Sequence, residues 1–184
     1  IRLSLDVLWG VPSIVYGALG MTVMLLLKLP YSLLAGILVV ALIELPLLTR
    51  ALDEILLLVP HDLMEAGYAL GANARQVAFK VILRRILPGV STAILLAFGR
   101  GIGDAAAVML VAGFQDGLPS SLLEPVATLP LAVFYLVNMP YPEVQARGYA
   151  AAVVLILLIL VVSVPSRLAG RRTGAAGNQK RRNT

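Results

Sequence analysis

The sequence predicts an all-α membrane protein, a bundle of about four spanning helices of roughly 20 residues each. Of its 184 residues, 59% are hydrophobic and 14% charged, whereas soluble domains carry about 45–50% apolar and 25% charged residues. The apolar residues gather in four long segments. A polar, basic stretch separates the second segment from the third, and we expect a partner outside the bilayer to bind this stretch.

The predicted spans cover residues 5–29, 31–58, 90–114 and 145–168. Pro30 ends the first span, and Pro46 predicts a kink in the second, because proline lacks an N–H and clashes with the preceding turn. Residues 1–169 are therefore expected to form one transmembrane domain. Residues 170–184 are polar and basic, and we expect them to form a disordered tail.

The distribution of Lys and Arg predicts the orientation in the membrane. Four basic residues lie between the second and third spans and six lie from Arg167 to the C-terminus, whereas the other two connections have one each. With an even number of spans, both basic regions lie on one side, which we expect to be cytoplasmic. Residues 115–144 are then external. Their apolar part, residues 126–137, is too short to span, and we expect a small external or re-entrant helix there.

The cytoplasmic connection, residues 61–89, predicts an elbow of two short amphipathic helices. Asp62 can cap the first helix, and Gly71 suits the left-handed position that ends it. Asn73 can cap the second helix, with Gln76 three residues later. A stiff projection of this kind suits insertion into a groove of a partner. The alternative is an ordinary hairpin that lies on the membrane surface.

The elbow resembles a known motif. Its pattern E-A-G-x3-G-x9-V-x-L over residues 65–83 is similar to the EAA loop of binding-protein-dependent (MetI-like) ABC importer permeases. This loop docks onto the ATPase subunit. Gly67 departs from the family pattern mildly, and Arg84 stands where the family has proline. The resemblance implies that coupling to the ATPase subunit involves Glu65, Ala66, Gly67, Gly71, Val81 and Leu83.

Three further segments resemble the permeases of phosphate importers: residues 10–17, 99–105 and 128–135. They follow one another as in those permeases, which usually have six spans, so we expect this chain to be the last four. The resemblance implies a permease subunit of an ATP-driven importer for inorganic phosphate in the cell inner membrane. It also implies several partners: two ATP-binding subunits, a second permease subunit and an external phosphate-binding protein.

Charged residues within the predicted spans are candidates for the translocation path, since burying an ionisable group there costs about 2.5–3.5 kcal/mol. Arg100 and Asp104 are four residues apart, which places them on one helix face, about 6 Å apart along the axis. They are either a self-neutralising pair or a path site in which the planar guanidinium of Arg100 binds the anion. The family resemblance favours the path. Glu44, two residues before Pro46, is either part of a kink or a third path residue.

Several function classes are disfavoured by absent residue types. The chain has no cysteine and one histidine, so we expect no disulfide and no metal site. It has no G-x4-G-K-[ST] phosphate loop and no catalytic constellation, and we expect neither enzymatic activity, nor a cofactor, nor nucleic-acid binding. The remaining alternatives are a permease for another oxyanion (molybdate, tungstate or sulfate) and an autonomous channel or scaffold.

Overall fold

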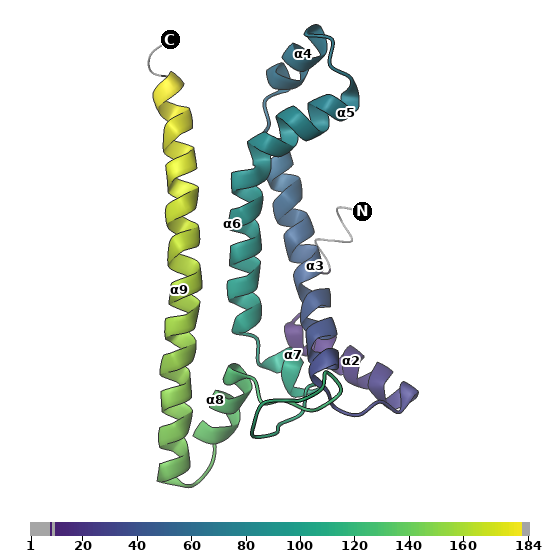
Figure 1. Ribbon diagram of the computed structural model, residues 1–184. Helices are drawn as coiled ribbons and strands as arrows, with labels where there is room; N and C mark the ends of the chain where they lie inside the picture. The colour runs from purple at the N-terminus through teal and green to yellow at the C-terminus, as the bar shows by residue number, and fades with distance from the viewer. Residues whose placement is uncertain (1–7, 9, 182–184) are drawn as a thin grey trace.

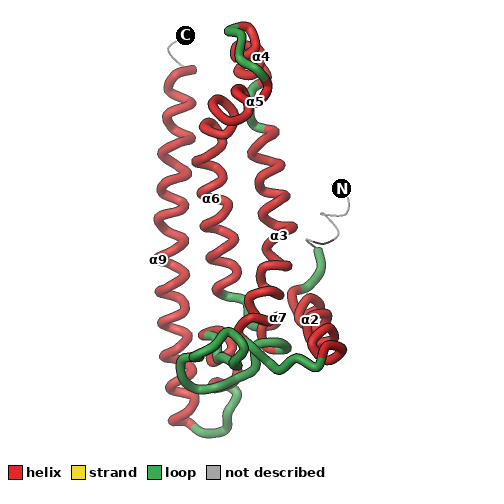
Figure 2. The backbone as a smooth tube through the Cα atoms, turned by 45° about the vertical axis from the view of Figure 1, so that its right-hand side comes forward, coloured by secondary structure: helices red, strands yellow, loops and turns green. Residues whose placement is uncertain are grey.

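The computed structural model describes residues 8 and 10–181, with side chains up to residue 164. Three long helices run alongside one another (Figures 1 and 2), and the shorter helices gather at the two ends. The long helices are α3 (Leu33–Leu57), α6 (Leu83–Ile102) and α9 (Pro142–Arg181). One end holds α4 (His61–Ala69) and α5 (Ala74–Gln76), and the other holds α2 (Ser13–Leu27), α7 (Ala106–Met109) and α8 (Leu129–Val137).

Within the described residues, three helices are long and apolar enough to cross a membrane: Leu33–Leu57, Ala74–Ile102 and Pro142–Val164. The predicted first span, residues 5–29, lies partly outside the described residues, and within them its helix α2 is too short to count among these three. The chain turns at Gly10, and α2 begins only after Pro12, which has no N–H with which to continue a helix. Its 15 residues extend about 22 Å, less than the roughly 30 Å of a bilayer core.

The third predicted span, residues 90–114, is displaced along the chain. The helix already begins at Ala74, passes through a π-helical turn η1 (Val77–Ile82) and continues as α6 to Ile102. The next helix, α7, starts immediately afterwards, and its Ala107 N–H donates to Asp104 Oδ1 at 3.0 Å. An aspartate that accepts a backbone N–H in this way favours a new helix start, so the span ends earlier than its apolar sequence predicts.

The second and fourth spans are confirmed in position. Helix α3 continues through the buried Pro46, and Ser32 caps its start by accepting from Ala35 N–H at 3.3 Å. Helix α9 continues to Arg181, beyond the predicted start of the tail at residue 170. Its Ala, Arg, Gln and Lys residues are good helix formers, and a helix that has already been nucleated extends readily.

The described core lies at the end of the bundle that holds α2 and α7. Glycines allow the close packing there, since a Cβ at Gly17 would lie 2.7 Å from the carbonyl oxygen of Ala107. Along the spans, by contrast, most large apolar side chains are exposed, as expected for surfaces that face lipid or other helices. The buried cluster of this core consists of Met24, Val39, Ile43, Ala107 and Val111.

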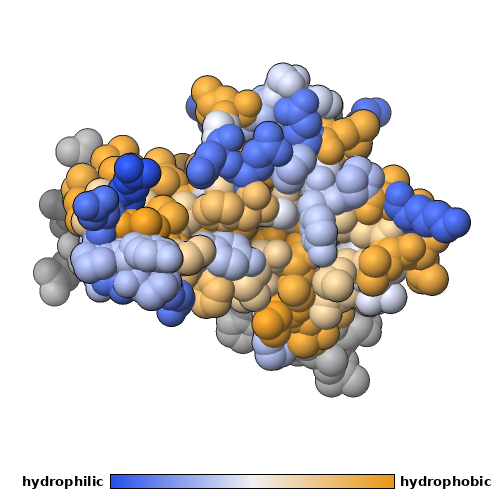
Figure 3. Space-filling view, turned by 90° about the horizontal axis from the view of Figure 1, so that it is seen from below, coloured by the Kyte–Doolittle hydropathy of each residue, from blue (hydrophilic) through white to orange (hydrophobic). Residues whose placement is uncertain are grey.

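The connection between α7 and α8 closes over the start of α3. Leu33 N–H donates to the carbonyl of Glu124, and Leu34 N–H to that of Leu122, both at 2.8 Å. These bonds satisfy backbone donors that a helix start leaves without intrahelical partners. The face at this end of the bundle carries hydrophilic side chains among hydrophobic ones (Figure 3). Helix α8 is the short helix predicted within residues 126–137.

Candidate functional site

The elbow turns at Gly71, whose φ is +80°. Nothing lies within 4 Å of the position that a Cβ would occupy, so glycine is needed here for its backbone conformation and not for space. Asn73 and Gln76 then form the predicted capping box: Gln76 N–H donates to Asn73 Oδ1 at 2.9 Å, and Asn73 N–H to Gln76 Oε1 at 3.0 Å. Both local predictions for this turn are confirmed.

Two other features of the elbow differ from the prediction. Helix α4 begins at His61, with Pro60 at its N-cap, and Asp62 lies in the first turn without a side-chain capping bond. The second arm is not a separate short helix, because α5 and η1 continue directly into α6. The elbow is therefore the end of a spanning helix, folded back through one tight turn onto α4.

Gly67 and Val77 hold the two arms of the elbow together. Val77 is 1% exposed, and a Cβ at Gly67 would lie 3.0 Å from its Cγ2 atom. Gly67, which departs from the family pattern, thus lies where the arms cross.

The remaining residues that the resemblance assigns to coupling lie at the surface or close to it. Glu65 and Ala66 are exposed, Val81 is half-buried and Leu83 is 41% exposed. The arms also expose four large apolar side chains that the resemblance does not single out: Leu63, Tyr68, Leu70 and Phe79. Exposed apolar groups beside polar ones are typical of a surface that binds a partner.

The intramembrane charges do not pair as predicted. Asp104 lies beyond the end of α6, and the structure brings Arg100 close to Glu44 instead, with Arg100 Nη1 3.9 Å from Glu44 Oε1. The two side chains are unequally covered: 44% of Arg100 is exposed but only 13% of Glu44. The i, i+4 rule fails here because the helix ends at Ile102, between the two predicted partners.

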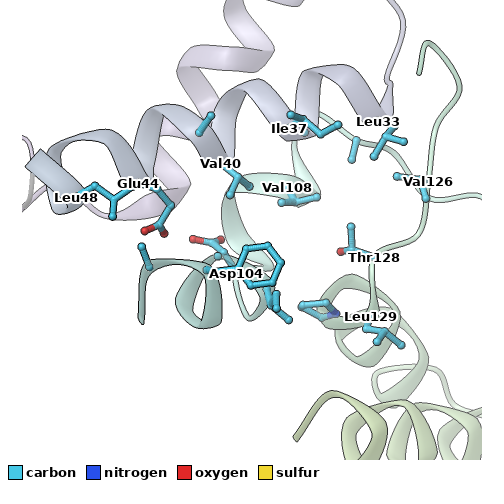
Figure 4. Close-up of a pocket in the computed structure, with 18 of the residues that line it drawn as sticks. Leu33, Ile37, Val40, Glu44, Leu48, Asp104, Val108, Val126, Thr128 and Leu129 are labelled. Atoms are coloured by element: carbon cyan, nitrogen blue, oxygen red, sulfur yellow. The ribbon is translucent and has the colours of Figure 1, made fainter. Parts of the chain in front are cut away.

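A cavity of about 670 Å³ lies between α3, the end of α6, α7 and residues 126–130. Its lining is mostly apolar, and Glu44, Asp104 and Thr128 supply its ionisable and hydroxyl groups. Glu44 and Asp104 point toward one another from α3 and from the segment after α6, with Thr128 on another wall (Figure 4). Arg100 does not line the cavity, although it lies beside Glu44.

Two polar atoms at this cavity are buried without a hydrogen-bond partner among the described residues: Glu44 Oε2 and Thr128 Oγ1. A buried polar atom left unsatisfied costs about 1–3 kcal/mol, so both atoms are suited to a partner that this chain does not supply. The sequence does not single out Thr128 as a site residue. The sequence feature that could have pointed to Thr128 is its position two residues before Pro130, where a loop leads into a helix.

A family model described as "binding-protein-dependent transport system inner membrane component" matches residues 1–174. The chain belongs to this family of membrane components.

Individual relatives are similar over most of this chain. It is 33% identical over 169 residues to the probable phosphate transport system permease protein PstA of Methanocaldococcus jannaschii. The aligned region covers 91% of this chain and 60% of the relative. It is 32% identical over 171 residues to PstA 2 of Mycobacterium bovis, covering 91% and 57%. It is 30% identical over 163 residues to PstA of Yersinia pestis, covering 89% and 55%. The chain thus spans somewhat more than half the length of these relatives.

Proposed function

We propose that this chain is a transmembrane permease subunit of an ATP-driven ABC importer for inorganic phosphate. It contributes to the translocation path in the cell inner membrane, and separate subunits hydrolyse ATP. The observation that carries the proposal is the similarity to phosphate permeases along about nine-tenths of the chain, together with a glycine-hinged elbow at the predicted motif.

The continuity of the elbow with a span supports a coupling role. Residues 74–102 form one helical run, about 43 Å long at 1.5 Å per residue. Its first turns belong to the elbow, and its last turn carries Arg100. Movement of the elbow by an ATPase subunit is therefore transmitted along one helix to the polar group near Glu44. The π-helical turn Val77–Ile82 within the run is the joint, since such turns occur often at functional sites.

The polar group of Glu44, Arg100 and Asp104 supports a path role. The Arg100 side chain is 44% exposed, and its planar guanidinium is suited to bind two phosphate oxygens. Glu44 holds the other side and moderates the affinity, so that the anion can be released. Asp104 and Thr128 complete the polar lining of the adjacent cavity.

The orientation places the elbow and the C-terminal end of α9 in the cytoplasm. Both lie at the same end of the bundle (Figure 1), as the distribution of basic residues requires. The opposite end, with α8 and residues 115–128, faces outward and receives the anion from an external phosphate-binding protein. A second permease subunit and two ATP-binding subunits complete the transporter.

The proposal is tested by the uptake of radiolabelled phosphate in the source organism after deletion of this gene and complementation. We expect uptake to be lost and restored, and excess molybdate, tungstate or sulfate not to compete. Glu65→Ala should abolish both uptake and transport-coupled ATP hydrolysis while the protein still inserts into the membrane. Normal coupling in that variant would refute the role of the elbow, and competition by another oxyanion would revise the substrate.

A further inference from the structure

A second cavity lies where α3 ends and α6 begins, next to the elbow. It has a volume of about 310 Å³ and is lined by Ile55, Leu58, Val59, Arg84, Arg85, Ile86, Pro88 and Gly89. The two helices touch at its floor, since a Cβ at Gly89 would lie 3.1 Å from Ile55. The cavity lies at the other end of the bundle from α7 and α8 and shares no lining residue with the larger one.

All the charged residues that line this cavity are positively charged. Arg84 and Arg85 are its charged lining residues, and neither has an ion pair or a side-chain hydrogen bond within the described part of the chain. The nearby acid Glu54 already pairs with Arg50 at 3.1 Å. Arginine donors without partners beside an apolar wall favour an anionic group that also carries hydrocarbon.

The surroundings of the cavity favour a lipid over a free ion. Leu57 and Leu58 are 65% and 81% exposed, and Leu87 is 57% exposed. These side chains lie where the apolar helices α3 and α6 meet the polar elbow. Basic pockets between spanning helices on the cytoplasmic side are suited to anionic headgroups.

We propose that this cavity binds the phosphate headgroup of an anionic phospholipid, with Arg84 and Arg85 on the phosphate and the acyl chains along the exposed leucines. The placement in the cytoplasmic leaflet rests on the orientation given under Proposed function. The family motif does not supply this site, because Arg84 stands where the family has proline. A bound headgroup would lie directly beside the π-helical turn that joins the elbow to α6.

Native mass spectrometry of the full chain in detergent tests the proposal, with phosphatidylglycerol and phosphatidylcholine offered at equal concentration. The wild type should retain phosphatidylglycerol roughly 30-fold more strongly, about fivefold for each arginine. Arg84→Gln with Arg85→Gln should abolish this preference, whereas the charge-conserving Lys pair should keep most of it. Arg75→Gln is the matched control, an exposed arginine of the elbow outside the cavity, and should leave the preference unchanged.

Four outcomes would overturn the proposal. The wild type could show no preference between the two lipids, or the Gln pair could keep it. Inorganic phosphate alone could bind with the same dependence on both arginines and displace phosphatidylglycerol at equal concentration, which would assign the site to the free ion. Finally, both arginines could crosslink to a co-expressed ATPase subunit in a chain without lipid preference. Lipid retention is measured without transport, so this test is independent of whether the chain imports phosphate.

Discussion

Arg100 Nη1 lies 3.9 Å from Glu44 Oε1, an ion pair that joins the last turn of α6 to the middle of α3. The separation exceeds that of a hydrogen bond, and the guanidinium is far more exposed than the carboxylate. Arg100 therefore lies beside Glu44 while 44% of its own side chain stays exposed. This geometry is suited to a cation that binds and releases an anion.

Arg100→Gln should reduce phosphate uptake at least tenfold, since a neutral amide neither attracts the anion nor matches two of its oxygens. The variant should still assemble, with a loss of stability of about 1 kcal/mol or less because the arginine is nearly half-exposed. Uptake in whole cells and thermal melting of the purified protein measure the two effects.

The double variant Arg100→Gln with Glu44→Gln separates transport from packing. Removal of the carboxylate charge should restore the melting temperature, because no buried charge is then left without a partner. Uptake should stay low if Arg100 binds the anion. Recovery of both the melting temperature and the uptake would show that Arg100 and Glu44 serve packing alone.

Gly71→Ala should impair coupling through backbone strain. Its φ of +80° costs an L-residue about 1–2 kcal/mol, and the elbow would relax to another turn. We expect transport-coupled ATP hydrolysis to fall severalfold. Gly117→Ala is the matched control, because Gly117 also has a positive φ and open space around it but lies in the connection between α7 and α8. An equal loss in both variants would contradict a specific role for the elbow.

Gly17→Ala should loosen the packing of α2 on α7. The added methyl would lie 2.7 Å from the Ala107 carbonyl oxygen, and a backbone atom cannot rotate away as a side chain can. Overpacking of this kind should destabilise the fold by about 1–3 kcal/mol. Thermal melting measures this loss. The neighbouring Ala18 is exposed, so Ala18→Val should change stability by less than about 0.5 kcal/mol. Similar melting temperatures for the two variants would show that α2 is not held at this contact.

The loop between α7 and α8 should loosen in acid. The Ser120 hydroxyl and then the Ser120 amide donate to Glu124, at 2.7 and 2.8 Å, and lower the pKa of its carboxyl group. A carboxyl group with a lowered pKa stabilises the folded loop above its unfolded pKa of about 4.3, and the effect is lost as the pH falls through the folded pKa.

A spin label at position 118 reports this transition, because Leu118 is 98% exposed. The label should be less mobile at pH 7, where the loop backbone is held, than below about pH 4. In Glu124→Gln it should be mobile at both pH values. The same acid transition in that variant would assign the effect to another group.

The sequence predicted the local parts of the elbow well. The positive φ at Gly71 and the capping box of Asn73 and Gln76 depend on residues at most three positions apart, so short-range rules suffice. The Arg50–Glu54 pair within α3, with Arg50 Nε 3.1 Å from Glu54 Oε1, follows from the same local spacing. Predictions that required a helix to continue over many residues did less well.

The candidate path site illustrates the difference. Composition identified Glu44, Arg100 and Asp104 as costly residues within apolar segments, but not which of them meet. The i, i+4 spacing of Arg100 and Asp104 assumes an unbroken helix, and the chain instead starts α7 after Gly103. Thr128 joins the cavity from a distant segment, and spacing in the sequence carries no information about such an approach.

The sequence by itself determined that this is a helical membrane protein with a basic, glycine-hinged elbow, because hydropathy, charge and capping act over a few residues at a time. The tertiary structure decided that the elbow is the end of the span that carries Arg100, and that Glu44 is the partner of this arginine. It also decided that Gly17 and Gly67 serve close packing. These relationships depend on where one helix ends and which distant helix lies beside it, and only the folded chain brings such residues together.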